Sequence, residues 1–69
     1  MDRNEICKYF GKPAYVYFND GSYLFGIISH SHNTDEYTLE SKDFKSMGKI
    51  FKIQPEEIDK IFASILYYW

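Results

Sequence analysis

The sequence predicts one mainly β domain, a small barrel of short strands preceded by a short helix. The chain has 69 residues, enough for a single domain over residues 1–69. Short runs of alternating side chains are separated by turn signals, of which Asn19-Asp20-Gly21 is the strongest hairpin signal. Gly26 lies inside one of these runs. A glycine there indicates a sharp bend or a close approach of two backbones, as small barrels require.

A chain this short builds only a modest core, so we expect another source of stability. Cys7 is the only cysteine, which excludes an internal disulfide, and no Cys/His cluster indicates a structural zinc. Association with further copies of the chain is the remedy that remains. Aromatic residues make up 20% of the chain, which suits both a small core and a contact surface.

The first element is a helix expected at about residues 2–11, with the barrel following from about residue 13 to residue 69. Asp2 or Asn4 is a candidate N-cap and Gly11 a candidate stop signal. Ile6, Tyr9 and Phe10 fall at i, i+3 and i+4, which makes one apolar stripe. As a small apolar residue of the expected helix, Cys7 is expected to fill the core.

Four strands are expected next, each with the alternation of a half-buried strand. They cover Ala14 to Phe18, Ser22 to about His30, Glu36 to Ser41, and about Lys49 to Ile53. In the third of them, Tyr37 and Leu39 should point inward. A polar loop over residues 29–35 and a lysine-rich turn over residues 42–49 join these strands.

The C-terminal segment supports two interpretations. Pro55 suits a first helical position, and apolar residues from Ile58 onward recur on one helical face, so periodicity slightly favours a helix. The alternative is one turn at Pro55–Ile58 and a final strand from about Ile61, which the β-branched and aromatic residues favour. The apolar end, Tyr67-Tyr68-Trp69, is expected to pack on its own barrel or on a neighbour.

Charge and hydropathy narrow the partners. The net charge of −2 argues against a protein that coats DNA, although Lys42, Lys45, Lys49 and Lys52 crowd into a short stretch opposed only by Asp43. That stretch is either a basic patch or an ordinary solvated hairpin. No apolar run is long enough to span a membrane, and the N-terminus lacks a signal-peptide pattern. We therefore expect a cytoplasmic protein without a membrane partner.

Three segments together resemble the Sm-like family, which includes the Lsm and Hfq proteins. Residues 16–28 resemble the first half of the family's Sm1 motif, a hydrophobic strand followed by Asp-Gly and then by a Gly about five residues on. Residues 37–39 resemble the end of Sm1, and residues 51–61 resemble the close of Sm2. The resemblance implies an SH3-like, five-stranded open barrel with a short N-terminal helix. It also implies a final strand rather than a helix, and a homo-oligomeric ring.

The same resemblance implies binding of single-stranded, often U-rich, RNA through two loops. The matching positions are His30, His32 and Asn33 in the polar loop, and Gly48 and Lys49 in the basic turn. Met47-Gly48 stands where the family has Arg-Gly, and the Lys-His signature of Hfq is missing. A module for protein–protein interaction without nucleic-acid binding is the alternative, which the acidic net charge and the aromatic residues support.

Catalytic and metal chemistry find little support in the sequence. His30 and His32 are two imidazoles at i, i+2, and a metal site would need a third ligand such as Asp35 or Glu36. The chain contains no nucleophile elbow, P-loop or HExxH motif. We therefore predict that the protein is not an enzyme, holds no metal and carries no cofactor.

Overall fold

The computed structural model describes residues 1–64 and confirms a mainly β fold with a short N-terminal helix. The described elements are α1 (Arg3–Ile6), the 3-10 turn η1 (Cys7–Tyr9), β1 (Pro13–Phe18), β2 (Tyr23–Ser31), β3 (Glu36–Ser41), the 3-10 turn η2 (Phe44–Ser46), β4 (Ile50–Ile53), the 3-10 turn η3 (Pro55–Glu57) and β5 (Ile58–Ala63). The predicted third strand has the observed bounds. No helix within residues 1–64 has both the length and the apolar character needed to cross a bilayer.

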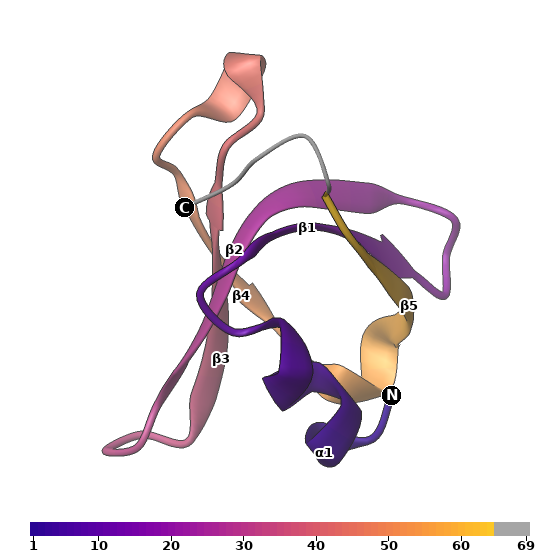
Figure 1. Cartoon of the computed structure of the whole chain (residues 1–69), viewed down its shortest axis with the longest axis vertical. Coiled ribbons are helices and arrows are strands. Elements are labelled where there is room, and N and C mark those ends of the chain that lie inside the picture. The colour runs from indigo at the N-terminus through magenta and orange to yellow at the C-terminus, as the bar shows by residue number, and fades with distance from the viewer. Residues whose placement is uncertain (65–69) are drawn as a thin grey trace.

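The five strands form one antiparallel sheet in the order β4-β3-β2-β1-β5. Figure 1 shows that β1 and β2 curve strongly, so that β5 comes round towards the side on which α1 lies. The β2–β3 turn and the loop that contains η2 project from opposite ends of the long β2–β3–β4 ladder (Figure 1). These two projecting ends carry the residues that the sequence indicates as functional.

The core lies on the inner face of the curved sheet and is capped by the N-terminal segment. Its fully buried side chains include Ile6, Val16, Ile28 and Leu39, which alternate with outward residues along the strands. The predicted inward orientation of Tyr37 is confirmed, because its side chain is 7% exposed. The buried strand residues form one hydrophobic cluster with Ile6 of α1.

The N-terminal helix is shorter than expected, and one prediction about it is wrong. The α-helical part ends at Ile6 and continues as a 3-10 turn to Tyr9. Tighter winding rotates the residues after Ile6 relative to a regular helix. Cys7 is therefore exposed rather than part of the core, and its thiol lies 3.1 Å from the carbonyl oxygen of Asn4.

Gly26 sits where β2 crosses closely over β3, as the sequence indicates. A Cβ atom at this position would overlap the carbonyl oxygen of Glu40 and would press on the side chain of Leu39. Gly26 is itself paired with Ala14 on one side and Ser41 on the other. The bend of the sheet thus depends on a residue without a side chain.

The C-terminal segment is a strand, so the helix that periodicity slightly favours is wrong for the described residues. One 3-10 turn at Pro55–Glu57 leads directly into β5, which pairs with β1. Ile58 and Ile61 are both buried although they are three residues apart. The register shifts between Tyr17 and Phe18, so Asp59 is an extra residue in a β-bulge. The bulge imitates helical spacing. Tyr67-Tyr68-Trp69 lie outside the described residues.

Candidate functional site

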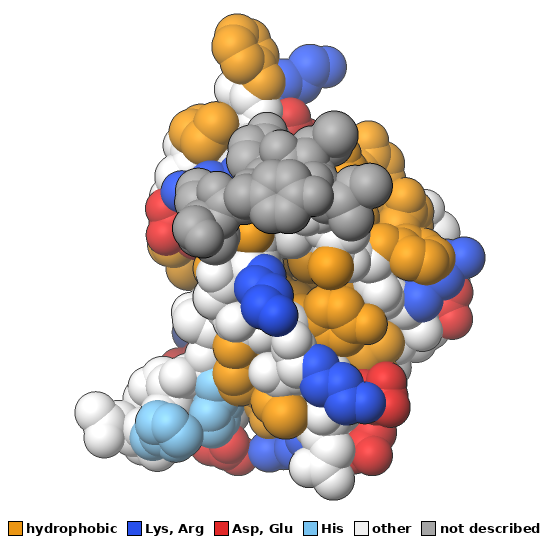
Figure 2. Space-filling view, in the orientation of Figure 1, with side chains coloured by type: hydrophobic (Ala, Val, Ile, Leu, Met, Phe, Trp, Pro, Cys, Tyr) orange, Lys and Arg blue, Asp and Glu red, His pale blue; other side chains and the backbone are white. Residues whose placement is uncertain are grey.

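The predicted site residues fall at opposite ends of β3. His30 is paired with Tyr37 at the start of β3, and His32 and Asn33 lie in the turn just before it. Lys49 accepts a hydrogen bond through its carbonyl from the N–H of Ser41 at the end of β3. A six-residue strand separates the two groups by roughly 20 Å. Figure 2 shows both histidines, in pale blue, at one projecting end of the molecule. The structure therefore does not bring Gly48 and Lys49 to the histidine end.

His30 is the centre of a stack of rings at the histidine end. Its side chain is only 17% exposed. The imidazole lies 4.5 Å from the Tyr37 ring and 6.3 Å from the Phe10 ring, nearly parallel to the latter. His32 approaches it edge-on, with ring centroids 5.1 Å apart. Phe10 comes from the segment after η1, so this stack joins the N-terminal segment to the sheet.

Asp35 ties the stack to α1. Its backbone has a φ of 55°, a conformation that aspartate tolerates better than most residues, and this turn aims the carboxylate at two cations or donors. One oxygen lies 2.8 Å from Nε2 of His30, and the other lies 3.1 Å from the guanidinium of Arg3. The hydrogen bond to His30, followed by that to Arg3, lowers the pKa of Asp35. The Asp35 carboxylate in turn raises the pKa of Arg3.

The arrangement fits recognition of a flat ring next to an anion. The Arg3 guanidinium lies 5.5 Å above the Tyr37 ring and is about half exposed, so it can meet a phosphate from the solvent side. His32 and Asn33 are exposed, and they offer an imidazole face and an amide. In residues 1–64 no three His, Cys, Asp or Glu side chains group closely enough to hold a metal ion.

A second ion pair borders the same end on β4. Lys52 lies 3.1 Å from the carboxylate of Glu36, and this contact is the main cause of the lowered pKa of Glu36. Gln54 and Pro55 line a small hollow there together with Arg3 and Asp35. The histidine end is therefore assembled from the start of α1, the β2–β3 turn and the β4–η3 connection.

Sequence reasoning missed the roles of Arg3, Asp35 and Tyr37 at this end. Arg3 lies 32 positions from Asp35, and no local spacing connects the two. The sequence indicates Asp35 only as a possible third metal ligand, and Tyr37 only as a core residue. The turn signals around Asn33 and Asp35 were the one local cue, because they predict that the carboxylate is held beside the end of β2.

Gly48 and Lys49 close the loop at the other end of β3. This loop, residues 42–49, is called the lysine hairpin. Gly48 has a φ of +83° and donates its N–H to the carbonyl of Ser41 at 2.8 Å. The ammonium of Lys49 lies 5.3 Å from the Phe51 ring centroid. Of the four lysines of the predicted cluster, Lys45 and Lys49 are exposed at this end and Lys42 is half-buried, whereas Lys52 lies at the histidine end beside Glu36.

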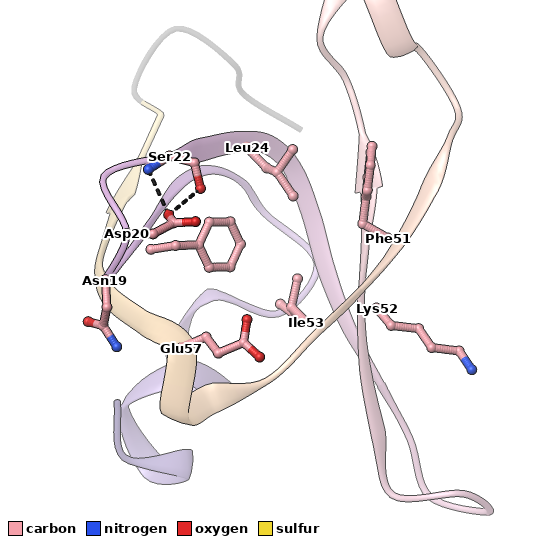
Figure 3. A pocket seen from close by; sticks show the side chains of 9 residues that line it. Asn19, Asp20, Ser22, Leu24, Phe51, Lys52, Ile53 and Glu57 are labelled. Atoms are coloured by element: carbon pink, nitrogen blue, oxygen red, sulfur yellow. Dashed lines mark hydrogen bonds between the residues drawn. The ribbon is translucent and has the colours of Figure 1, made fainter.

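A hollow with a volume of about 330 Å³ lies between the β1–β2 turn and β4. Leu24, Ile53 and Glu57 point into it, whereas Lys52 points away (Figure 3). Asp20 borders it, and hydrogen bonds from Ser22 lower the pKa of Asp20. The hollow opens beside β4, one of the two end strands of the sheet.

The chain matches no protein-family model, no curated protein and no solved structure.

Proposed function

We propose that this protein is a subunit of an Sm-like, SH3-like barrel ring, and that the ring binds single-stranded RNA or nucleotides at the histidine end. The proposal rests on one observation above all. The sheet has the order β4-β3-β2-β1-β5, so each end strand pairs on one side only among residues 1–64. Unpaired strand edges invite pairing with another chain, and natural proteins cover them.

Both end strands also carry apolar side chains in water. Ile50 on β4 is 58% exposed and Phe62 on β5 is 54% exposed. The hollow beside β4 adds an apolar wall of Leu24, Phe51 and Ile53 that a neighbour can cover. If β4 of one copy pairs with β5 of the next, every copy uses two different surfaces. Such a head-to-tail contact closes into a ring when the rotation allows it.

The histidine end supplies the ligand-binding chemistry in this proposal. A base can stack on His32 and on the half-buried ring stack. The Asn33 amide can hydrogen-bond the edge of a base, and Arg3 can pair with a phosphate. His30, His32 and Asn33 stay in the proposed site, and Arg3 joins them. Gly48 and Lys49 are excluded from it by their distance along β3.

The ring is tested by the solution mass from light scattering. The chain mass is 8.2 kDa, and we expect a discrete multiple of it. Ile50→Lys places a charge on the β4 edge and should shift the mass towards one chain, whereas Lys8→Ala, on the N-terminal turn, should not. A monomeric wild-type chain at high concentration would refute the ring.

RNA binding is tested by titrating U-rich and A-rich oligonucleotides at two salt concentrations. His32→Ala should weaken binding about tenfold, in line with the loss of one stacking partner. Lys49→Ala is the matched control at the opposite end and should leave the affinity unchanged. Binding that is missing at low salt, or that Lys49→Ala weakens more than His32→Ala does, would overturn the site.

A second function has one observation in its favour. The outer face of β1, β2 and β5 carries a connected group of rings, with Tyr17 in contact with Tyr23 at 5.6 Å and with Phe62 at 5.8 Å. Tyr23 is 56% exposed. Exposed tyrosines of this kind are typical of protein interfaces. If the oligonucleotides do not bind, an interaction module that uses this aromatic face becomes the better proposal.

A further inference from the structure

The lysine hairpin presents apolar side chains to water from a well-ordered loop. Phe44 is 95% exposed and Met47 is 62% exposed. Ile50, the first residue of β4, is 58% exposed next to them. One exposed apolar residue is ordinary on a protein surface, but two on one projecting loop and a third at the start of the next strand are not. Figure 2 shows a hydrophobic group beside a basic one at the end that projects opposite the histidines.

Hydrogen bonds within the loop fix the conformation that exposes Phe44. Ser41 is fully buried at its base. The Ser41 hydroxyl lies 2.7 Å from that of Ser46 and accepts the N–H of Asp43 at 3.2 Å, while its carbonyl accepts the N–H of Gly48. The Asp43 carboxylate caps η2 by accepting the N–H of Lys45. This framework holds η2 so that Phe44 points away from the molecule.

The loop is cationic on an acidic body. Residues 42–49 contain three lysines and one aspartate, a net charge of +2. The other residues contain five basic and nine acidic side chains, so their net charge is −4. Lys42 lies 3.4 Å from Glu40, but no carboxylate in residues 1–64 pairs with the ammonium groups of Lys45 or Lys49. An anionic surface would therefore attract this loop and repel the remainder of the molecule.

We propose that the lysine hairpin docks onto an anionic lipid bilayer, with Phe44 and Met47 entering the headgroup region and the lysines contacting the lipid charges. An apolar tip with a basic rim is the composition that binds at membrane interfaces. Two of the three exposed apolar side chains are aliphatic, which disfavours stacking on nucleic acid bases. A surface-bound loop needs no membrane-spanning segment, so this contact differs from the membrane insertion that the sequence argues against.

The proposal stands apart from RNA binding, because it does not use the histidine end, and its two entering side chains, Phe44 and Met47, lie outside the β4 edge that the ring would use. If the ring forms, its cyclic symmetry places every lysine hairpin on the same face. Several weak tips then act together, and binding strengthens without any new contact.

The test is co-sedimentation of the full chain with vesicles at low salt. Vesicles of phosphatidylcholine with phosphatidylserine should bind the protein, and vesicles of phosphatidylcholine alone should bind it far less. Phe44→Ser should reduce binding roughly tenfold, as expected for losing one large apolar side chain from the interface. Lys45→Ala and Lys49→Ala should each reduce it about fivefold. Binding should also fall as salt rises.

Matched controls separate the tip from general stickiness. Lys8→Ala and Lys12→Ala each remove an exposed lysine of the N-terminal segment, outside the lysine hairpin. Both should bind vesicles like the wild type, with circular dichroism confirming that every variant folds. The proposal is overturned if the wild type ignores the anionic vesicles or if Phe44→Ser binds them equally well. It is also overturned if Phe44→Ser weakens oligonucleotide binding and spares vesicle binding, because the tip would then contact RNA.

Discussion

The two ends of the β2–β3–β4 ladder differ in how their charged and apolar side chains are partnered, although the same strands form both. At the histidine end, side chains from several segments neutralise one another, and Asp35 joins His30 to Arg3. At the lysine hairpin, hydrogen bonds around Ser41 hold the backbone, while Phe44 is 95% exposed and no carboxylate among residues 1–64 pairs with Lys45 or Lys49. The charged side chains of the histidine end contact one another, whereas side chains of the lysine hairpin are exposed to solvent.

The difference shows how a small sheet separates two surfaces. The histidine end depends on long-range contacts, since Arg3, Phe10 and Asp35 come together only in the fold. The lysine hairpin depends mainly on contacts within ten residues, supplemented by the hydrogen bond from the N–H of Lys42 to the carbonyl of Phe25. Mutations can therefore affect one end without the other, except at the bend between them.

Gly26→Ala should have the largest effect, because it affects both ends at once. The added Cβ would overlap the backbone of Glu40, and a backbone cannot swing aside as a flexible side chain can. We expect a loss of about 3 kcal/mol or more in the free energy of unfolding, which is a large share of the stability of so small a domain. Urea unfolding followed by circular dichroism measures it.

Gly48→Ala is the matched control for that prediction. Gly48 has positive φ but open space around its α-carbon, so the substitution strains one turn and creates no overlap. We expect a loss of about 1 kcal/mol, restricted to the lysine hairpin. Equal losses for the two variants would mean that β2 and β3 do not approach closely at Gly26.

Much of this fold follows from local sequence signals, and Gly26 illustrates why. Turn residues, alternating side chains and one glycine inside a strand can each be recognised within a few positions of the sequence. The first four strands and the bend are therefore predicted correctly. The final strand shows the opposite case. The bulge at Asp59 depends on pairing with β1, and the spacing of Ile58 and Ile61 alone favours a helix. Local patterns cannot reveal a register that another strand imposes.

The candidate site was less predictable for the same reason. His30, His32 and Asn33 are neighbours in sequence and stay together in space. The grouping of these residues with Lys49 depended on how two loops sit on the sheet, and the six residues of β3 hold those loops apart. Arg3 enters the histidine end only because the fold brings the start of α1 next to Asp35 and Tyr37, which no spacing in the sequence indicates.

Ser41→Ala should have an intermediate effect that separates the ends. Its buried hydroxyl bonds Ser46 and the N–H of Asp43, so removal leaves both without their partner. We expect a loss of about 1–3 kcal/mol in the free energy of unfolding, with weaker vesicle binding and unchanged RNA binding. Ser29→Ala is the control, since Ser29 makes a similar hydroxyl contact to Thr38 on an exposed surface. A loss as small as that of the control would show that Ser41 does not organise the loop.

Asp35→Asn should have the smallest effect on stability, and its pH dependence identifies the cause. The pKa of Asp35 is lowered in the folded protein by His30 and Arg3, so the folded state favours the carboxylate. Its contribution is complete above the ordinary aspartate value of about 4 and disappears as the pH falls through the lowered folded value. Thermal unfolding of wild type and variant should thus differ at pH 5 and above and converge at more acidic pH, roughly below 3.

Asp59→Asn, at an exposed bulge without an ion pair among residues 1–64, should show no such convergence. A difference that persists undiminished in acid would mean that Asp35 stabilises its turn through its shape and backbone conformation. In that case the charge on Asp35 does not hold His30 and Arg3 together.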